Sequence, residues 1–300
     1  MSYIRRRLGD LSAYVFILPA FLILGLFLVY PVIWSIIASF KDIKPMALQK
    51  SGLFGIPGQF VGFDYYVDAL QNPLFIKALV NTLYFGVIFV PITMLGSVLL
   101  ALLVNQKLAG VNFVRTVFFI PYIVSVVSAS LIFVFLFNGD RGLVNALLSQ
   151  VGIAGPNWLA SSVWAMPVIA IMTCWRNIGY FMLIYLSGLQ SIPTDLYEVA
   201  DVEGASKFEK FRYVTWPLLG RVSLVVMILL LISSLNVFQE VYIMTGGGPA
   251  DSTTTVPFLI FNRAFHYFEI GQAAAMSYIL FVIVIIITII QKKFVDKRLG

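Results

Sequence analysis

The stretch EVADVEGASKFEKFRYVTWP, Glu198 to Pro217, is the most highly charged segment of a sequence that is otherwise apolar. Of the 300 residues, 60% are hydrophobic and only 11% are charged. Globular chains usually carry about 45–50% apolar and about 25% charged residues. A chain with so few polar residues cannot form a water-exposed surface around a soluble core. The composition therefore predicts a membrane protein with one soluble segment.

Six stretches are long and apolar enough to span a membrane, which takes about 20 residues. The first is too long for the apolar part of a cleaved signal peptide, which has about 7–15 residues. The sequence therefore predicts an all-α membrane protein with a single transmembrane domain over residues 1–300. The expected spans are approximately Leu11–Phe40, Ala78–Val104, Phe113–Phe137, Val163–Leu189, Leu218–Ile243 and Gly271–Ile290.

The distribution of Lys and Arg predicts how these spans are oriented. Thirteen of these residues lie on the side of the two termini and of the Glu198–Pro217 segment, and six lie on the other side. Because positive charge favours the cytoplasm, we expect both termini and this segment to be cytoplasmic. The outer loop Asn138–Ser162 is expected to carry a short helix after Asp140.

The charged segment has the pattern of two short helices joined at a glycine. Asp195 with Glu198 resembles a capping pair, and Ser206 with Glu209 forms a capping box. Gly204 between them suits the left-handed residue that ends a helix. Such a pair, apolar on one side, fits a groove on another protein. An amphipathic loop lying on the lipid headgroups is the alternative.

This segment is similar to the EAA motif of the membrane subunits of ABC importers. The matching positions are Glu198, Ala200, Gly204, Val214 and Pro217, and the last of these is also where we expect the second helix to end. Val199 stands where the family usually has Ala. The stretches GLQSIPTDLYEVADVEGAS, WPLL, MTGGGPADSTTT and GQAAAMSYILF look like sugar-type permeases of the maltose-transporter-like class, and the resemblance runs from about Tyr65 to the C-terminus.

The resemblance implies a type I ABC importer permease in a prokaryotic cell membrane. Residues 190–217 would form a cytoplasmic coupling loop that docks on an ATP-hydrolysing subunit, with Arg212 either pairing across that interface or solvated. The implied partners are a second homologous permease subunit, two ATP-binding cassette subunits and an extracytoplasmic solute-binding protein. The implied coupling residues are Glu198, Ala200, Gly204, Ser206, Arg212 and Pro217.

The chain lacks the G-x-x-x-x-G-K-[ST] phosphate loop, so we expect ATP and Mg²⁺ to be bound by the partner subunits. With one Cys and one His, no multi-histidine or Cys-rich metal site is expected, and we assign no catalytic residue. The resemblance makes Gly246, Gly247, Gly248 and Pro249 a flexible outer loop that faces the binding protein. A plain connecting turn is the alternative.

A sugar path needs hydrogen-bonding and aromatic side chains near the middle of the membrane. The resemblance implies that the fourth and fifth spans supply them, more firmly as segments than as single positions. Arg176 and Glu240, ionisable within spans, either line the path as a pair or are satisfied by a backbone carbonyl and by water. Tyr122, Ser125 and Ser128 of the third span could also face the path, although small residues at helical spacing are as often helix contacts. The candidate residues are Trp175, Arg176, Asn177, Gly179, Tyr180, Ser234, Asn236, Gln239 and Glu240.

Three functions compete at this point. The first is one half of an ATP-driven importer, moving a di- or oligosaccharide or a glycerol phosphate. The second is a self-sufficient secondary transporter, which would need carboxylates at the midplane and broken helices in inverted repeats. The third is a membrane enzyme, which would need an acid, base or metal constellation. We favour the importer with an oligosaccharide as cargo.

Overall fold

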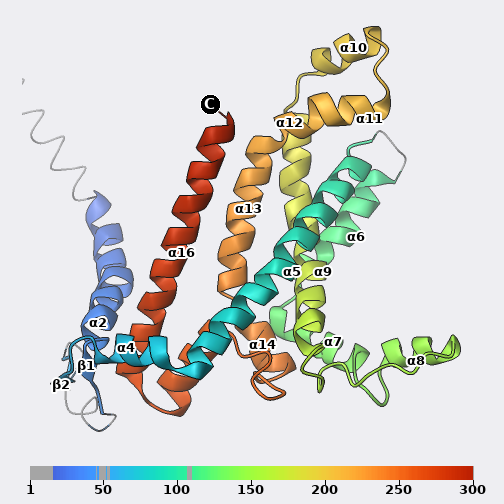
Figure 1. The fold of residues 1–300 in the computed structure, drawn as a ribbon. Coiled ribbons are helices and arrows are strands. Elements are labelled where there is room, and N and C mark those ends of the chain that lie inside the picture. The colour runs from blue at the N-terminus through green and yellow to red at the C-terminus, as the bar shows by residue number, and fades with distance from the viewer. Residues whose placement is uncertain (1–15, 45, 47–51, 53–54, 107–109, 300) are drawn as a thin grey trace, which may run out of the picture. The chain divides into compact units, whose positions relative to one another are not determined.

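The computed structural model describes residues 16–44, 46, 52, 55–106 and 110–299 (Figure 1). Residues 11–15 of the first predicted span and Arg5–Arg7 of the charge count lie outside this range. Within it, four helices are long and apolar enough to cross a membrane: Phe16–Ala38, Pro73–Val104, Ala165–Gln190 and Ile270–Gln291. The number becomes six if two bent helix pairs each count as one span.

The chain forms two compact units, of which the first comprises residues 1–71 and 260–280. Two hydroxyl pairs hold its elements together: Tyr278 with Ser35 at 2.6 Å, and Tyr66 with Ser39 at 2.7 Å. Gly271 lies so close to the Lys41 carbonyl oxygen that an added Cβ would be 2.3 Å from it. The elements are η1 (Gly25–Val29), α2 (Tyr30–Ala38), the antiparallel pair β1 (Lys41–Asp42) and β2 (Gln59–Phe60), α4 (Asp64–Gln71), η3 (Asn262–His266) and the start of α16 (Ile270–Leu299).

The second unit, residues 72–259 and 281–300, holds most of the helices. They are α5 (Pro73–Val104), α6 (Val111–Ile123), α7 (Val126–Leu136), α8 (Leu143–Gln150), α9 (Ala165–Gln190), α10 (Thr194–Val202), α11 (Lys207–Lys210), η2 (Phe211–Thr215), α12 (Trp216–Leu218), α13 (Gly220–Leu235), α14 (Gln239–Met244) and the rest of α16; α15 (Val256–Phe261) joins the two units. The short helix expected after Asp140 is α8.

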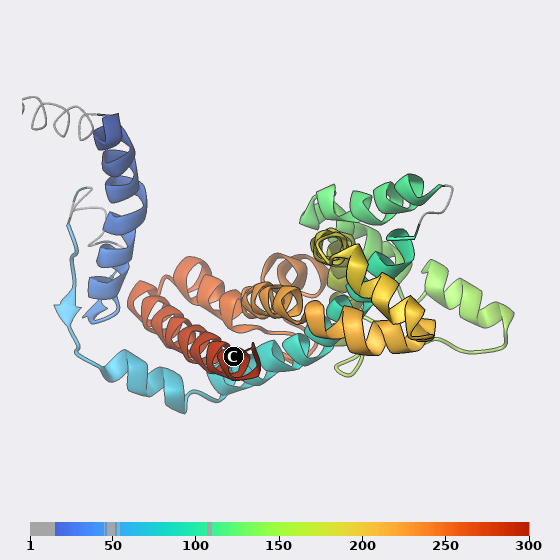
Figure 2. The ribbon, with the colours of Figure 1, turned by 90° about the horizontal axis from the view of Figure 1, so that it is seen from above.

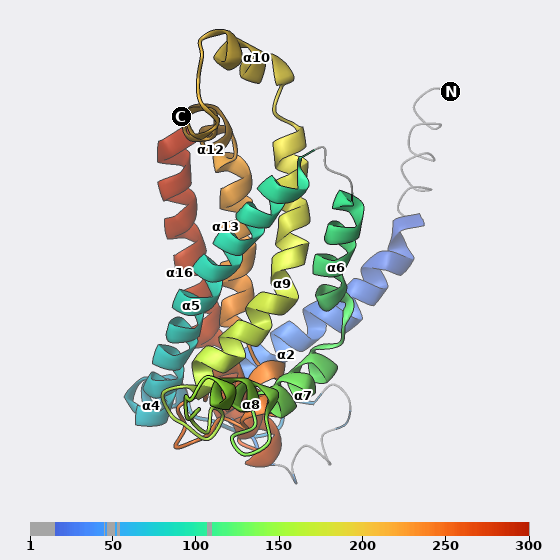
Figure 3. The same cartoon turned by 90° about the vertical axis from the view of Figure 1, so that its right-hand side faces the viewer.

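The core of the second unit lies where α5 packs along α9 (Figures 1 and 3). Phe85 and Phe89 of α5 and Met182 and Tyr185 of α9 are fully buried there. The Ser97 hydroxyl donates to the Ile178 carbonyl at 3.0 Å, which joins the two helices within the apolar interface. Packing of this kind fixes the position of the middle of α9, where the predicted path residues lie.

Two predicted spans are interrupted in the structure. In the third, α6 ends at Ile123 and α7 starts at Val126, and the axis bends by 98° across the extended residues Val124 and Ser125. In the fifth, α13 ends at Leu235 and α14 starts at Gln239. Hydropathy indicates neither break: the first lies between apolar residues, and the polar residues Ser234, Asn236 and Gln239 around the second are equally expected of a path lining. The six-span count and the cytoplasmic termini stay predictions.

Candidate functional site

The elbow of the charged segment forms as the sequence predicts. Gly204 has φ +75°, and the bonds around it close α10 as a Schellman motif. The Ala205 N–H donates to the Ala200 carbonyl at 2.9 Å, and the Gly204 N–H donates to the Asp201 carbonyl at 3.1 Å. The chain therefore turns at this glycine with its terminal carbonyls satisfied.

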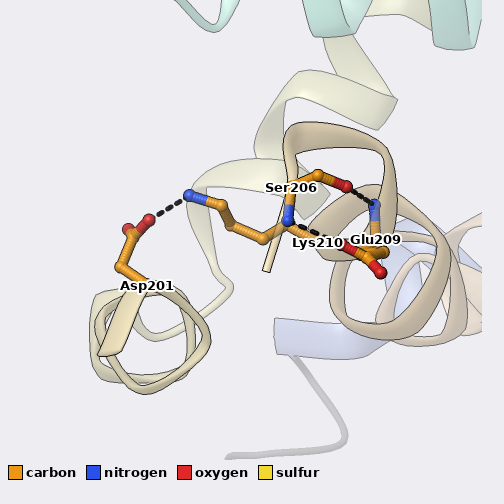
Figure 4. Close-up of polar contacts among 4 residues, drawn as sticks. All are labelled: Asp201, Ser206, Glu209 and Lys210. Atoms are coloured by element: carbon orange, nitrogen blue, oxygen red, sulfur yellow. Dashed lines mark hydrogen bonds and ion pairs between the residues drawn. The ribbon is translucent and has the colours of Figure 1, made fainter. Parts of the chain in front are cut away.

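The second helix begins with the predicted capping box (Figure 4). The Ser206 hydroxyl accepts from the Glu209 N–H at 3.3 Å, and the Glu209 carboxylate accepts from the Ser206 N–H at 2.7 Å. These bonds favour the charged carboxylate and hold the pKa of Glu209 below its ordinary value. An ion pair between Asp201 and Lys210 links the two helices across the elbow.

Two local predictions for this segment are wrong. Asp195 is not a cap, because α10 starts at Thr194. Pro193 holds the cap position, and no side chain bonds to the helix there. Pro217 does not end the second helix either. The π-turn η2 precedes it, with the Trp216 N–H bonded to the Phe211 carbonyl, and the helix continues to Leu218 before bending by 61° into α13. A π-turn next to a proline is a common origin of such bends.

The solvent-facing surface of the charged segment, Glu198–Pro217, carries exposed apolar side chains. Val202 is 89% exposed, Tyr213 76%, Phe208 73% and Val199 59%. Underneath, the Tyr197 and Thr215 hydroxyls lie 2.9 Å apart and join α10 to η2. Glu198 and Arg212 are also exposed. Exposed apolar groups of this kind mark interaction surfaces when they cluster.

In the fourth span, the Arg176 side chain contacts residues at the break between α6 and α7. Its Nε lies 3.5 Å from the Val124 carbonyl oxygen, and its guanidinium carbon lies 5.6 Å from the centre of the Tyr122 ring. Tyr122 in turn stacks on Tyr180, with ring centres 4.5 Å apart. Of the two interpretations for Arg176, the structure shows the backbone carbonyl. Among the described residues, Arg176 and Glu240 form no ion pair.

Two other path candidates in this span make contacts inside the protein. A Cβ added to Gly179 would lie 1.8 Å from the Phe118 carbonyl oxygen, so this glycine allows α9 to approach α6. The Asn177 amide donates to the Thr173 carbonyl of its own helix at 2.7 Å. Trp175 is 40% exposed and contacts the Phe133 ring.

The fifth-span candidates divide between packing and the helix break. Ser234 is buried, and a Cβ on Gly86 of α5 would be 3.1 Å from its hydroxyl, so it lies at a helix contact. Asn236 caps α13 at the break, is exposed, and donates to the Ile232 carbonyl at 2.8 Å. Gln239 and Glu240 open α14 on the far side of the break. The break therefore places Asn236, Gln239 and Glu240 close along the chain.

A cavity of about 640 Å³ lies between α6, α9 and α13. Two of the described residues predicted to face the path line it, Tyr180 of α9 and Tyr122 of α6. Sequence reasoning missed Ser187 of α9 and Ser191, which caps the C-terminal end of that helix. The lining is Phe119, Tyr122, Tyr180, Leu183, Ile184, Ser187, Gly188, Ser191, Val222 and Val225.

Hydrogen bonds hold the Gly246–Pro249 loop, which the sequence predicts to be flexible. Thr253 donates to the Gly248 carbonyl at 2.8 Å, and Thr254 donates to the Gly247 carbonyl at 3.2 Å. Thr255 donates to the Val237 carbonyl at 2.9 Å, which connects the loop to the break before α14. All three threonines are buried. The sequence shows them only as a polar run.

The start of α5 anchors the same loop. Lys77 donates to the Ala250 carbonyl at 2.6 Å, and the Asn81 amide donates to the Asp251 and Thr254 carbonyls at 2.9 Å each. Ala250 and Asp251 both have positive φ, a conformation that L residues hold only when neighbours enforce it. Asn81 is therefore a positioning residue for the loop.

We expect Asn81→Ala to loosen this loop, because each lost hydrogen bond contributes about 0.5–1.5 kcal/mol. The measurement is hydrogen exchange at residues 245–255, which should become faster. The matched control is Asn112→Ala on α6, whose side chain takes no part in the loop bonds. Equal exchange in the two variants would show that Asn81 does not hold the loop.

The fold and its sites define a multi-span membrane protein with a rigid, partner-ready segment at one end and a hydrogen-bonded loop at the other. Comparison with known proteins gives the family. Residues 92–300 match the family described as binding-protein-dependent transport system inner membrane component. The chain belongs to this family, and it is a membrane transport component.

Curated relatives match over nearly the whole length. The permease protein SmoG of the sulfoquinovosyl glycerol transport system of Agrobacterium fabrum is 33% identical over 97% of this chain and 92% of its own. MalF of the trehalose/maltose transport system of Thermococcus litoralis is 32% identical, covering 98% and 95%. UgpA of the sn-glycerol-3-phosphate transport system of Yersinia pestis is 30% identical, covering 95% and 94%.

A solved structure of a bacterial ABC transporter involved in the import of alginate superposes with a TM-score of 0.86. Its sequence is 23% identical and the match covers all of both chains. The chain therefore shares the fold of that transporter.

Proposed function

We propose that this chain is one half of the transmembrane pore of an ATP-driven sugar importer. It spans the membrane six times with both termini in the cytoplasm. It pairs with a homologous permease subunit and with two ATPase subunits, which bind ATP and Mg²⁺. An extracytoplasmic binding protein delivers the cargo, and the pore opens to one side at a time.

The observation that carries the proposal is the pre-shaped coupling segment. Capped helices, an ion pair across the elbow and the Tyr197–Thr215 contact make it a rigid body. Its exposed Val202, Phe208 and Tyr213 need a partner surface to cover them. A helix pair of this kind fits a groove on an ATPase subunit, with Glu198, Ala200 and Arg212 at the contact and Gly204 setting the angle.

At the opposite end, the Gly246–Pro249 loop faces the binding protein. The residues that follow it, Ala250, Asp251 and Thr255, bond to Lys77, Asn81 and Val237. These bonds connect the docking surface to the break before α14, where Asn236, Gln239 and Glu240 lie. The path continues past Trp175 and Tyr180 on α9 into the cavity. Aromatic rings and amides of this kind suit the apolar faces and hydroxyl groups of sugars.

A di- or oligosaccharide is the cargo that we favour. The named cargo of one relative supports it, since MalF belongs to a trehalose/maltose transport system. A glycerol phosphate is the second candidate, because UgpA is a comparable relative. A phosphate is bound best by several charged donors. The Nε of Arg176 already donates to the Val124 carbonyl. That contact favours the neutral cargo.

The test is to purify the chain with the ATPase, second permease and binding protein encoded beside it, in lipid nanodiscs. Neutral oligosaccharides, disaccharides and glycerol phosphates are then screened for stimulated ATP hydrolysis. We expect stimulation by a neutral sugar together with the binding protein. Uptake by this chain alone, driven by an ion gradient, would contradict the proposal.

Asn236→Ala should weaken cargo-stimulated hydrolysis by roughly tenfold, the loss of about one hydrogen bond to cargo. Basal hydrolysis should hold, because Asn236 is exposed and its side chain donates to a carbonyl of its own helix. The matched control is Asn138→Ala, in the outer loop away from the path. If both variants respond to cargo as the wild type does, Asn236 is not in the path.

A further inference from the structure

Helix α8 of the outer loop presents an apolar stripe that the described chain leaves exposed. Leu143, Leu147 and Val151 recur every four residues and so lie along one side of the helix. They are 56%, 56% and 70% exposed, and Ile153 beyond them is 54% exposed. Four large apolar side chains in eleven residues form a surface that favours contact with an apolar partner.

The opposite side of α8 is bound into its own loop. The Asn145 amide donates to the Gly139 and Pro156 carbonyls at 2.7 and 3.1 Å, and its oxygen accepts from the Trp158 indole at 2.7 Å. A Cβ at Gly155 would lie 1.9 Å from that oxygen, so the loop closes tightly on Asn145. The loop thus fixes which side of α8 faces outward.

The chemistry of the surrounding sequence identifies the partner. From Gly142 to Trp175 the chain has no Asp, Glu, Lys, Arg or His. Surfaces exposed to water carry charge, and protein interfaces have polar rims. The headgroup boundary of a membrane instead accepts uncharged apolar side chains, and tryptophans gather there.

The position of α8 agrees with such a boundary. It joins α7 to α9, the latter long and apolar enough to cross a membrane. Figure 1 shows α8 lying crosswise to α9, beyond α7, and Figure 2 shows it projecting away from the α5–α9 core. Val163 and Trp164, just before α9, are 68% and 45% exposed, so apolar side chains are exposed where this helix begins as well.

We propose that α8 lies in the outer headgroup boundary of the membrane, with Leu143, Leu147 and Val151 toward the acyl chains. The partner of this surface is the lipid itself. Interfacial helices bury their apolar face by roughly 5–10 Å. Because no charge is present, binding does not depend on anionic lipid. Anchoring here sets the depth of α7, the second half of the broken third span, and of α9.

The test uses the whole transporter in phosphatidylcholine nanodiscs, with partner subunits free of cysteine. In a Cys174→Ala background, Leu147→Cys and Ser149→Cys each carry a nitroxide spin label. Ser149 is the matched control, because it is exposed on the opposite side of the same helix. Collision rates are measured with oxygen, which partitions into the acyl region, and with a nickel chelate, which stays in water.

We expect the ratio of oxygen to nickel collisions to be several-fold higher at position 147 than at position 149. Equal ratios at the two positions would overturn the proposal. So would a label at position 147 that meets the nickel chelate freely until the binding protein is added and is then shielded, because that result would make α8 a protein-docking surface. Neither outcome bears on whether the transporter carries sugar.

Discussion

Gly204→Val is expected to reduce coupled uptake at least about tenfold while the chain stays folded and inserted. Gly204 has φ +75°, and a Cβ there would meet nothing within 4 Å. The effect therefore comes from backbone conformation alone, which for an L residue costs roughly 1–2 kcal/mol in the left-handed region. Relief of that strain changes the angle between α10 and α11. The measurement is uptake into proteoliposomes, alongside the melting temperature.

Gly152→Val provides the matched control for strain. Gly152 has φ +77°, and the space around it is equally open, but it lies at the end of α8, far along the chain from the coupling segment. We expect its uptake to stay near the wild-type level. If Gly204→Val transports as well as Gly152→Val, with subunits assembled in both, the elbow has no part in coupling.

The second large effect is expected for Gly179→Ala. The new methyl group would lie 1.8 Å from the Phe118 carbonyl oxygen and 2.5 Å from its carbon, both backbone atoms that cannot rotate away. Helices α6 and α9 must then separate, and overpacking of this kind costs about 1–3 kcal/mol. The Tyr122–Tyr180 stack between these helices should be disturbed as well. We expect a lower melting temperature in nanodiscs and a loss of transport.

Gly220→Ala is the control for this substitution. It places the same methyl group on a helical glycine in the same unit, with nothing within 4 Å. Because Ala is the better helix former, its melting temperature should be unchanged or slightly higher. Equal melting temperatures for Gly179→Ala and Gly220→Ala would mean that α6 and α9 do not pack as closely as the structure shows.

Local features could be predicted from the sequence because neighbouring residues encode them. The left-handed turn at Gly204 and the Ser206–Glu209 box each depend on residues within one helical turn. The breaks in the third and fifth spans could not be predicted, since residue composition, apolar at the first and mixed at the second, does not report backbone direction. At Val124 the extended backbone is satisfied by Arg176, which lies 52 positions further along the chain.

The candidate path shows the same limit. Ser234 and Gly179 have the residue types of a polar cavity, yet both lie in helix contacts whose partners, Gly86 and Phe118, belong to other helices. The anchoring of the outer loop depends on Asn81 and Thr254, which are 173 positions apart. A single sequence contains no signal that joins such distant residues.

The closed geometry of the coupling segment has a thermodynamic consequence for assembly. Fixing the backbone of one residue costs roughly 1–2 kcal/mol of conformational entropy. In this segment the Schellman bonds, the capping box and the Asp201–Lys210 pair order the chain before any other subunit arrives. Association then loses little further entropy there, so more of the interaction free energy appears as affinity for the neighbouring subunit.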